Sequence, residues 1–169
     1  MLSPGNTMLQ AVSDLPLLQH YRATEYHGVE LLQRLFRKID DPQLHLELTR
    51  QIADETRHAL LWSERICELG GSLVPPRRVP QVPRRSQSER VTLQLDLFAQ
   101  LHVAEERLQQ QYRVHLSQSA QDHSTTAILQ AILSDEAWHC DWVKQVLAAQ
   151  QRKFGRTRVA ATIDYFWSL

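Results

Sequence analysis

Four long segments of the chain repeat apolar residues every three or four positions, which is the spacing of an amphipathic helix. The segments are residues 14–39, 42–70, 88–117 and 124–150. Pro42 bars continuation of the first helix, and Gly70 marks the end of the second. Asp41 is the expected N-cap of the second helix. The pattern predicts an all-α bundle whose first two helices, joined by a very short turn, are antiparallel neighbours.

The stretch from residue 71 to 87 contains four prolines and four arginines, so it can be neither a helix nor a central strand. Extended at about 3.3 Å per residue, it reaches roughly 50 Å, which exceeds the length of the preceding helix. We expect a crossover that returns along the bundle between the second and third helices. Residues 151–169 are predicted to form a short fifth helix or a docked tail beside a bundle spanning residues 1–150.

The composition limits which binding partners and which cellular compartment we expect for the protein. The chain has 169 residues, enough for one domain with a sizeable core, and its 19 Lys and Arg cancel its 19 Asp and Glu. No global field therefore favours nucleic acid or a membrane, although the arginines of residues 71–87 leave open a patch for an anionic ligand or RNA. No apolar run approaches the roughly 20 residues of a membrane span, and no signal peptide is recognised. The two cysteines form no CxxC motif, so we expect a reduced, cytoplasmic protein.

Each of the four apolar stripes carries one glutamate near its middle. These residues are Glu25, Glu55, Glu105 and Glu136. Other glutamates, such as Glu30 and Glu106, fall on polar faces. Four carboxylates pointing into one core are costly, because each unpaired buried charge costs several kcal/mol and the charges repel one another. The pattern requires positive charge among them, or protonation.

Two of these glutamates begin a Glu-x-x-His motif, ending at His58 and at His139. The only two Asp-Glu dipeptides of the chain, beginning at Asp54 and Asp135, both continue into these motifs. Residues three apart on a helix lie about 5–6 Å from each other, so the Glu and His of one motif can bind the same metal. The spacing between the two halves also repeats, at 80 residues for the lone glutamates and 81 for the motifs. The chain thus consists of two helix pairs of the same design.

A glutamate on each of two helices and a Glu-x-x-His on each of two others resembles the ferritin-like di-iron carboxylate superfamily. The long crossover is similar to the single crossover of that fold. The resemblance covers residues 14–150 and implies two iron ions, with manganese as an alternative, held by mixed oxygen and nitrogen ligands. It implies terminal ligands Glu25 and Glu105, bridging ligands Glu55 and Glu136, and histidine ligands His58 and His139. Asp54 and Asp135 are expected to accept hydrogen bonds from the imidazole N–H groups.

The roles that we predict for the aromatic residues near these ligands are less specific. Tyr21 and Tyr112 are expected to be core residues with satisfied hydroxyls, with a redox or substrate-contact role left open. Trp138 and Trp142 are expected on the other side of the last long helix, against a docked tail or a subunit interface rather than near the metals.

The resemblance leaves several activities open. Ferritins usually keep one Glu-x-x-His rather than two, and Leu108 replaces a carboxylate typical of rubrerythrins. We therefore expect a di-iron oxidoreductase that activates O₂ for hydroxylation or a related oxidation of a small organic substrate, with an external electron donor. Association into a homodimer is left open. Its pocket is expected to be lined by Tyr21, Trp62, Leu101 and Leu108. The alternatives are a rubrerythrin-like peroxide or O₂ scavenger, a ferroxidase or iron-storage protein, and a metal-free helical binding module.

Overall fold

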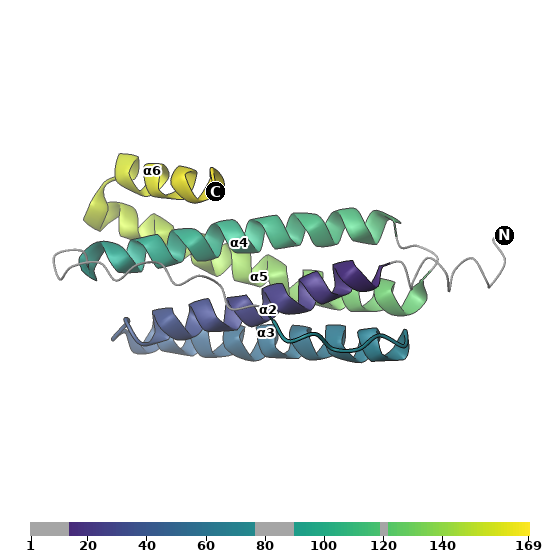
Figure 1. Ribbon diagram of the computed structural model, residues 1–169. Coiled ribbons are helices and arrows are strands. Elements are labelled where there is room, and N and C mark those ends of the chain that lie inside the picture. The colour runs from purple at the N-terminus through teal and green to yellow at the C-terminus, as the bar shows by residue number, and fades with distance from the viewer. Residues whose placement is uncertain (1–13, 77–89, 119–121) are drawn as a thin grey trace.

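The predicted all-α bundle is confirmed by the computed structural model, which describes residues 14–76, 90–118 and 122–169. Its helices are α2 (Leu15–Phe36), α3 (Pro42–Glu68), α4 (Arg90–Gln118), α5 (His123–Phe154) and α6 (Arg156–Trp167). The four long helices lie side by side, and α6 folds back from the end of α5 to lie beside α4 (Figure 1). Within each of the pairs α2–α3 and α4–α5 the helices run in opposite directions (Figure 1).

Helices α3 and α4 run in the same direction, so the end of α3 and the start of α4 lie at opposite ends of the bundle (Figure 1). The first residues of the predicted crossover contact α2. Gln19 Nε2 donates to the carbonyl of Ser72 at 2.7 Å, and Arg22 Nη1 donates to the carbonyl of Val74 at 2.8 Å. The rest of the predicted crossover, with its arginines, lies outside the described residues.

The helix ends follow the sequence signals. The predicted N-cap Asp41 accepts hydrogen bonds from the backbone N–H of Gln43 at 2.8 Å and of Leu44 at 3.2 Å. Gly70, just after α3, has φ of 76°, a left-handed conformation that favours glycine. Close by, Arg65 of α3 contacts Asp122, the N-cap of α5, at 2.8 Å. This ion pair ties the end of one helix pair to the start of the other.

Two apolar clusters fill the bundle, one on each side of its middle. Toward the α6 end lie Leu31, Leu32, Leu35, Leu48, Leu95, Phe98, Leu101, Val143 and Leu147 with their neighbours. Toward the other end lie Leu18, Tyr21, Trp62, Ile66, Leu108, Tyr112, Leu129 and Ile132. In all four long helices the predicted metal ligands fall between the residues of these two clusters. The centre is therefore flanked by apolar packing on both sides along the axis of the bundle.

The C-terminal segment forms a helix, one of the two expected alternatives. Helix α5 continues to Phe154, four residues beyond the expected end, before Gly155 starts α6. Val159 of α6 is buried in the same apolar cluster as Trp142. Arg107 of α4 donates to the carbonyl of Trp167 at 2.7 Å and lies over its ring. Helix α6 is thus docked on the bundle.

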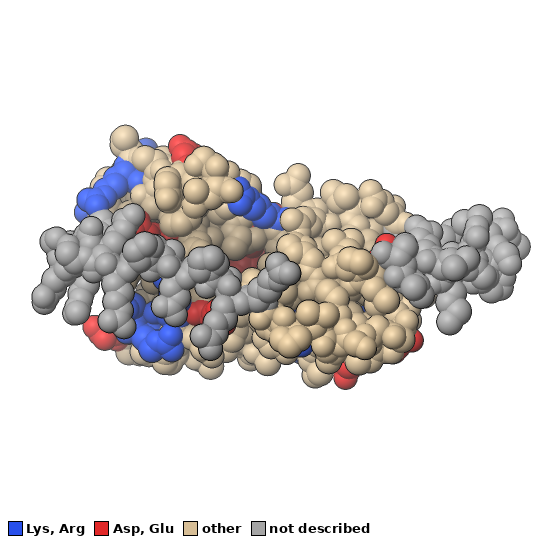
Figure 2. Space-filling view, in the orientation of Figure 1, with Lys and Arg blue, Asp and Glu red and all other residues tan. Residues whose placement is uncertain are grey.

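The surface agrees with the balanced charge of the sequence. On the face shown in Figure 2, charged side chains of both signs gather toward the α6 end, while the other half is mostly uncharged. None of the helices in the described residues is long and apolar enough to cross a membrane.

Candidate metal centre

The structure brings all six sequence-predicted ligand residues together in the middle of the bundle, each at most 3% exposed. They form two overlapping groups, in each of which one ligand atom per residue lies within 4.8 Å of the others. One group is Glu25, Glu55, His58 and Glu136, and the other is Glu55, Glu105, Glu136 and His139. Glu55 and Glu136 belong to both groups, which is the position that bridging ligands occupy.

Several oxygen and nitrogen atoms that could bind a metal at this centre have no hydrogen-bond partner among the described residues. They are Glu25 Oε2, both carboxylate oxygens of Glu136, and the Nδ1 atoms of His58 and His139. A buried polar atom left unsatisfied costs about 1–3 kcal/mol, and more when it is charged. Two divalent cations cancel the charge of four carboxylates and provide partners for these atoms. The mixed oxygen and nitrogen donor set fits two iron ions.

Burial and mutual repulsion determine where protons lie when no metal is bound. Burial, with Glu105 next in importance, raises the pKa of Glu55 well above its usual range. Burial and Glu136 do the same to the pKa of Glu105. Burial opposes charge on His58 as well, but Glu136 and Glu25 outweigh it and raise its pKa to about 10. Glu136 is held ionised by His139 and His58, which lower its pKa to about 2 against the effect of burial.

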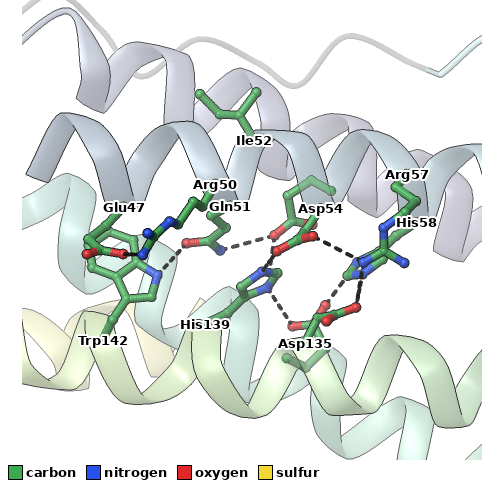
Figure 3. A network of polar contacts seen from close by, with 12 residues as sticks. Glu47, Arg50, Gln51, Ile52, Asp54, Arg57, His58, Asp135, His139 and Trp142 are labelled. Carbon is green, nitrogen blue, oxygen red and sulfur yellow. Dashed lines mark hydrogen bonds and ion pairs between the residues drawn. The ribbon is translucent and has the colours of Figure 1, made fainter.

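The two histidines are oriented by aspartates from the opposite helix. His58 Nε2 of α3 lies 3.2 Å from Asp135 Oδ2 of α5, and His139 Nε2 of α5 lies 3.4 Å from Asp54 Oδ2 of α3 (Figure 3). In both cases Nδ1 is left facing the carboxylates of the centre. Metal-bound histidines commonly use such an acceptor to fix the ring and its tautomer. Asp54 and Asp135 are therefore placed where the sequence predicted, but each serves the other motif's histidine.

Arg57 joins these two aspartates and was missed at the sequence level. Its Nη2 donates to Asp54 Oδ1 at 3.1 Å and to Asp135 Oδ2 at 2.6 Å (Figure 3). The corresponding position of the second motif is Trp138, whose ring centroid lies 5.4 Å from that of His139. A basic residue inside one Asp-Glu-x-x-His run, with two such runs expected to face each other, is the signal that could have identified it.

Gln51 also belongs to the centre, and it corrects the expectation for Trp142. Gln51 Nε2 donates to Glu55 Oε1 at 3.0 Å and to Glu105 Oε1 at 2.6 Å. Trp142 Nε1 donates to Gln51 Oε1 at 2.9 Å, so this indole reaches the centre through one amide (Figure 3). The prediction that Trp142 points away from the metals was wrong, because a residue three positions after His139 lies on the same helix face. The expected packing against the C-terminal segment is found as well.

Tyr112 is buried, and its hydroxyl is satisfied as expected. The hydroxyl donates to Glu25 Oε1 and accepts a hydrogen bond from Trp62 Nε1 at 3.0 Å. Burial and the neighbouring Glu25 raise the pKa of Tyr112 well above its usual value. Tyr21 packs against this ring with 4.7 Å between the centroids. The phenol therefore remains a neutral hydrogen-bond donor to the carboxylate.

A groove of about 880 Å³ between α2 and α4 reaches the centre at Glu55 and Glu105. Leu101 and Leu108 line it as predicted, whereas Tyr21 and Trp62 pack in the apolar cluster instead. Gly28 of α2 lies in the wall of the groove, over Glu55. A Cβ at this position would come within 3.2 Å of Glu55 Oε2, so the missing side chain makes room for that carboxylate.

Comparison with known proteins agrees with this architecture. The chain is similar in structure to a bacterioferritin from Desulfovibrio desulfuricans, whose diiron site is described in different catalytic states. The match has a TM-score of 0.70 and 19% sequence identity, and it covers 96% of this chain and 91% of the bacterioferritin chain. The chain is also similar to Mycobacterium tuberculosis bacterioferritin BfrA, with a TM-score of 0.57, 19% identity and 96% of each chain covered. No curated protein matches it in sequence. A family model for a ferritin-like domain matches residues 22–152, and the chain belongs to this family.

Proposed function

We propose that this protein is a ferroxidase that oxidises Fe(II) with O₂ at a di-iron centre. The observation that supports this most strongly is the pair of overlapping carboxylate–histidine groups whose inward-facing donor atoms lack partners in the described structure. In this proposal Glu25 and His58 hold one iron, and Glu105 and His139 hold the other. Glu55 and Glu136, which belong to both groups, lie between the two ions.

The surrounding residues prepare these ligands. Protons held by Glu55, Glu105 and His58 in the metal-free state leave when cations bind, because a metal ligand must be deprotonated. Tyr112 and Gln51 donate hydrogen bonds that keep the terminal carboxylates in place. When bound, two Fe(II) ions would supply one electron each, which suits a two-electron reduction of O₂.

Iron oxidation is favoured over the hydroxylation expected from the motifs. That expectation depended on the idea that two Glu-x-x-His motifs argue against an iron-handling ferritin. The structural neighbours are bacterioferritins, and one of them is described with a diiron site. This similarity favours an iron-oxidising function over hydroxylation.

The test is iron oxidation by the metal-free protein. Fe(II) is added without air, O₂ is then admitted, and ferric iron is followed by near-ultraviolet absorbance. We expect oxidation well above the rate in buffer, abolished in Glu55→Ala and retained in the control Glu30→Ala, whose carboxylate is exposed. Equal rates in wild type, Glu55→Ala and buffer would contradict the proposal. Faster oxidation with peroxide than with O₂ would favour the rubrerythrin-like alternative.

The groove gives a reason to keep O₂-dependent oxidation of an organic substrate as a second candidate. Its volume lies within the usual range of small-molecule sites, and it ends at two carboxylates of the centre. This activity needs an external electron donor, which a ferroxidase does not. Catalytic O₂ consumption that depends on both a reductant and an organic compound would favour it. Assembly into a large iron-filled shell would instead favour storage of the oxidised iron.

A further inference from the structure

Arg57 makes both of its ionic contacts through a single nitrogen atom. Nη2 lies 3.1 Å from Asp54 Oδ1 and 2.6 Å from Asp135 Oδ2. The same oxygen of Asp135 lies 3.2 Å from His58 Nε2, and the second oxygen of Asp54 lies 3.4 Å from His139 Nε2. The chain His58–Asp135–Arg57–Asp54–His139 is therefore continuous from one histidine to the other (Figure 3).

We propose that Arg57 is a positioning residue that couples the two histidine ligands of the centre. The proposal rests on the metal assignment made above, and it assigns Arg57 a role in both halves at once. Arg57 touches neither histidine directly and acts only through the two aspartates.

Three features separate this arrangement from an ordinary surface ion pair, which contributes little to the stability of a protein. The guanidinium side chain is 44% exposed, but the histidines it reaches through the aspartates are fully buried. The contacts of Arg57 bridge α3 and α5, so they fix the spacing of the two motifs rather than one helix alone. Finally, the other motif has Trp138 in the equivalent position, and among the described residues Arg57 is the Lys or Arg that pairs with these aspartates.

The chemical consequence follows from the charge on the aspartates. An aspartate that accepts a hydrogen bond from an imidazole N–H makes the other ring nitrogen a stronger donor to metal. Arg57 contacts one oxygen of each of these carboxylates and so fixes the direction in which they face the two rings. Its removal is expected to loosen both imidazole hydrogen bonds together.

The experiment uses the full chain loaded with Co(II) in place of iron. Proton spectra of such proteins show exchangeable imidazole N–H signals displaced far from the rest. Asp135→Asn assigns the signal of His58, and Asp54→Asn assigns that of His139. The variant tested is Arg57→Met, with Arg57→Lys as the conservative variant. The matched control is Arg50→Met on the same helix, because within the described part of the chain Arg50 pairs with Glu47, at 3.3 Å, and not with either aspartate.

We expect Arg57→Met to shift both histidine signals, to speed their exchange with water, and to weaken Co(II) binding by about tenfold. Arg57→Lys should restore both signals, because one nitrogen makes both contacts, and Arg50→Met should leave them unchanged. If Arg57→Met leaves both signals as in the wild type, or alters only one, the coupling is wrong. If Arg57→Met does not fold, wild-type exchange of both signals in Arg57→Lys supports the proposal and altered exchange of only one overturns it. Failure of the wild-type protein to bind two Co(II) ions contradicts the proposed function instead.

Discussion

The two halves of the centre have the same ligands but different neighbours. In the half with Glu25, a phenol supports the carboxylate, since Tyr112 donates to it and is itself held by Trp62. In the half with Glu105, the support is the amide of Gln51, which also reaches Glu55. The groove formed by the described residues reaches Glu105 of this second half and the shared Glu55. Repeated ligands therefore do not make two equivalent metal positions.

The difference arises because each half is supported by the other helix pair. Tyr112 of α4 serves Glu25 of α2, whereas Gln51 of α3 serves Glu105 of α4. Ligands repeat with a spacing of 80 or 81 residues, but these supporting residues do not. The two halves are thus interlocked, and their chemistry can diverge while the ligand set stays the same.

The largest effect is expected from the glutamates shared by both halves. Glu55→Ala or Glu136→Ala should reduce bound iron from two equivalents per chain to below about half an equivalent, because each residue belongs to both ligand groups. Glu25→Ala and Glu105→Ala should each weaken mainly one position. Elemental analysis after anaerobic Fe(II) loading measures this.

The matched controls are Glu30→Ala and Glu106→Ala. Glu30 is exposed, and Glu106 belongs to neither ligand group but forms an ion pair with Lys144, whose Nζ lies 2.5 Å from its carboxylate. Both variants should therefore bind two equivalents of metal. Loss of metal in Glu106→Ala but not in Glu105→Ala would show that the helix face assigned to α4 is wrong by one residue.

The metal-free protein is expected to lose stability as pH rises. Folded Glu55 and Glu105 hold protons that the unfolded chain releases above a pH of about 4.5. Folded His58 keeps its proton up to a pH of about 10, whereas the unfolded chain loses it near 6.5. The folded state therefore binds more protons in this window, so its stability decreases with pH, and the low pKa of Glu136 contributes no slope above about 4.5.

We expect the Tm of metal-free protein to fall by roughly 5–10 °C between about pH 5 and pH 9. The iron-loaded protein should show little of this slope, because the ligands are then deprotonated and paired with cations. Thermal unfolding followed by circular dichroism gives both curves. A metal-free Tm that rises across this range would mean that the buried carboxylates are ionised without metal.

A smaller effect should distinguish the supports of the two halves. Tyr112→Phe removes the donor to Glu25, and Gln51→Leu removes the donor to Glu105 and Glu55. Each should weaken metal binding by about tenfold or more, with Tyr112→Phe affecting one position and Gln51→Leu affecting the position at the groove. Stepwise Co(II) titration measures the two affinities. Identical titration curves for the two variants would remove the distinction between the halves.

The smallest effect is expected at the groove. Gly28→Ala places a Cβ about 3.2 Å from Glu55 Oε2, so this carboxylate must shift by a few tenths of an ångström. We expect two equivalents of metal still to bind, with an affinity lower by only a few-fold. Ala23→Gly, at a half-buried position on the same helix, changes helix propensity by a similar amount in the opposite sense, so an effect of propensity alone would have opposite signs in the two variants. A complete loss of one equivalent would show that Glu55 has no freedom to adjust.

The ligand residues could be predicted from the sequence because helical periodicity fixes which residues share a face. The stripes therefore placed Glu25, Glu105 and both Glu-x-x-His motifs in one core, where the structure brings them together. The roles of Arg57 and Gln51 could not be predicted from periodicity in the same way. Their roles depend on how α3 faces α5 and α4, and the pattern within one helix carries no information on that.

The central claim is that the six residues hold two iron ions that share Glu55 and Glu136. A crystal structure of the protein loaded anaerobically with Fe(II), with anomalous diffraction at the iron edge, tests it directly. We predict two anomalous peaks, one contacting Glu25 and His58 and the other contacting Glu105 and His139, with both shared glutamates between them. A single peak, or iron bound only outside these residues, would contradict the account.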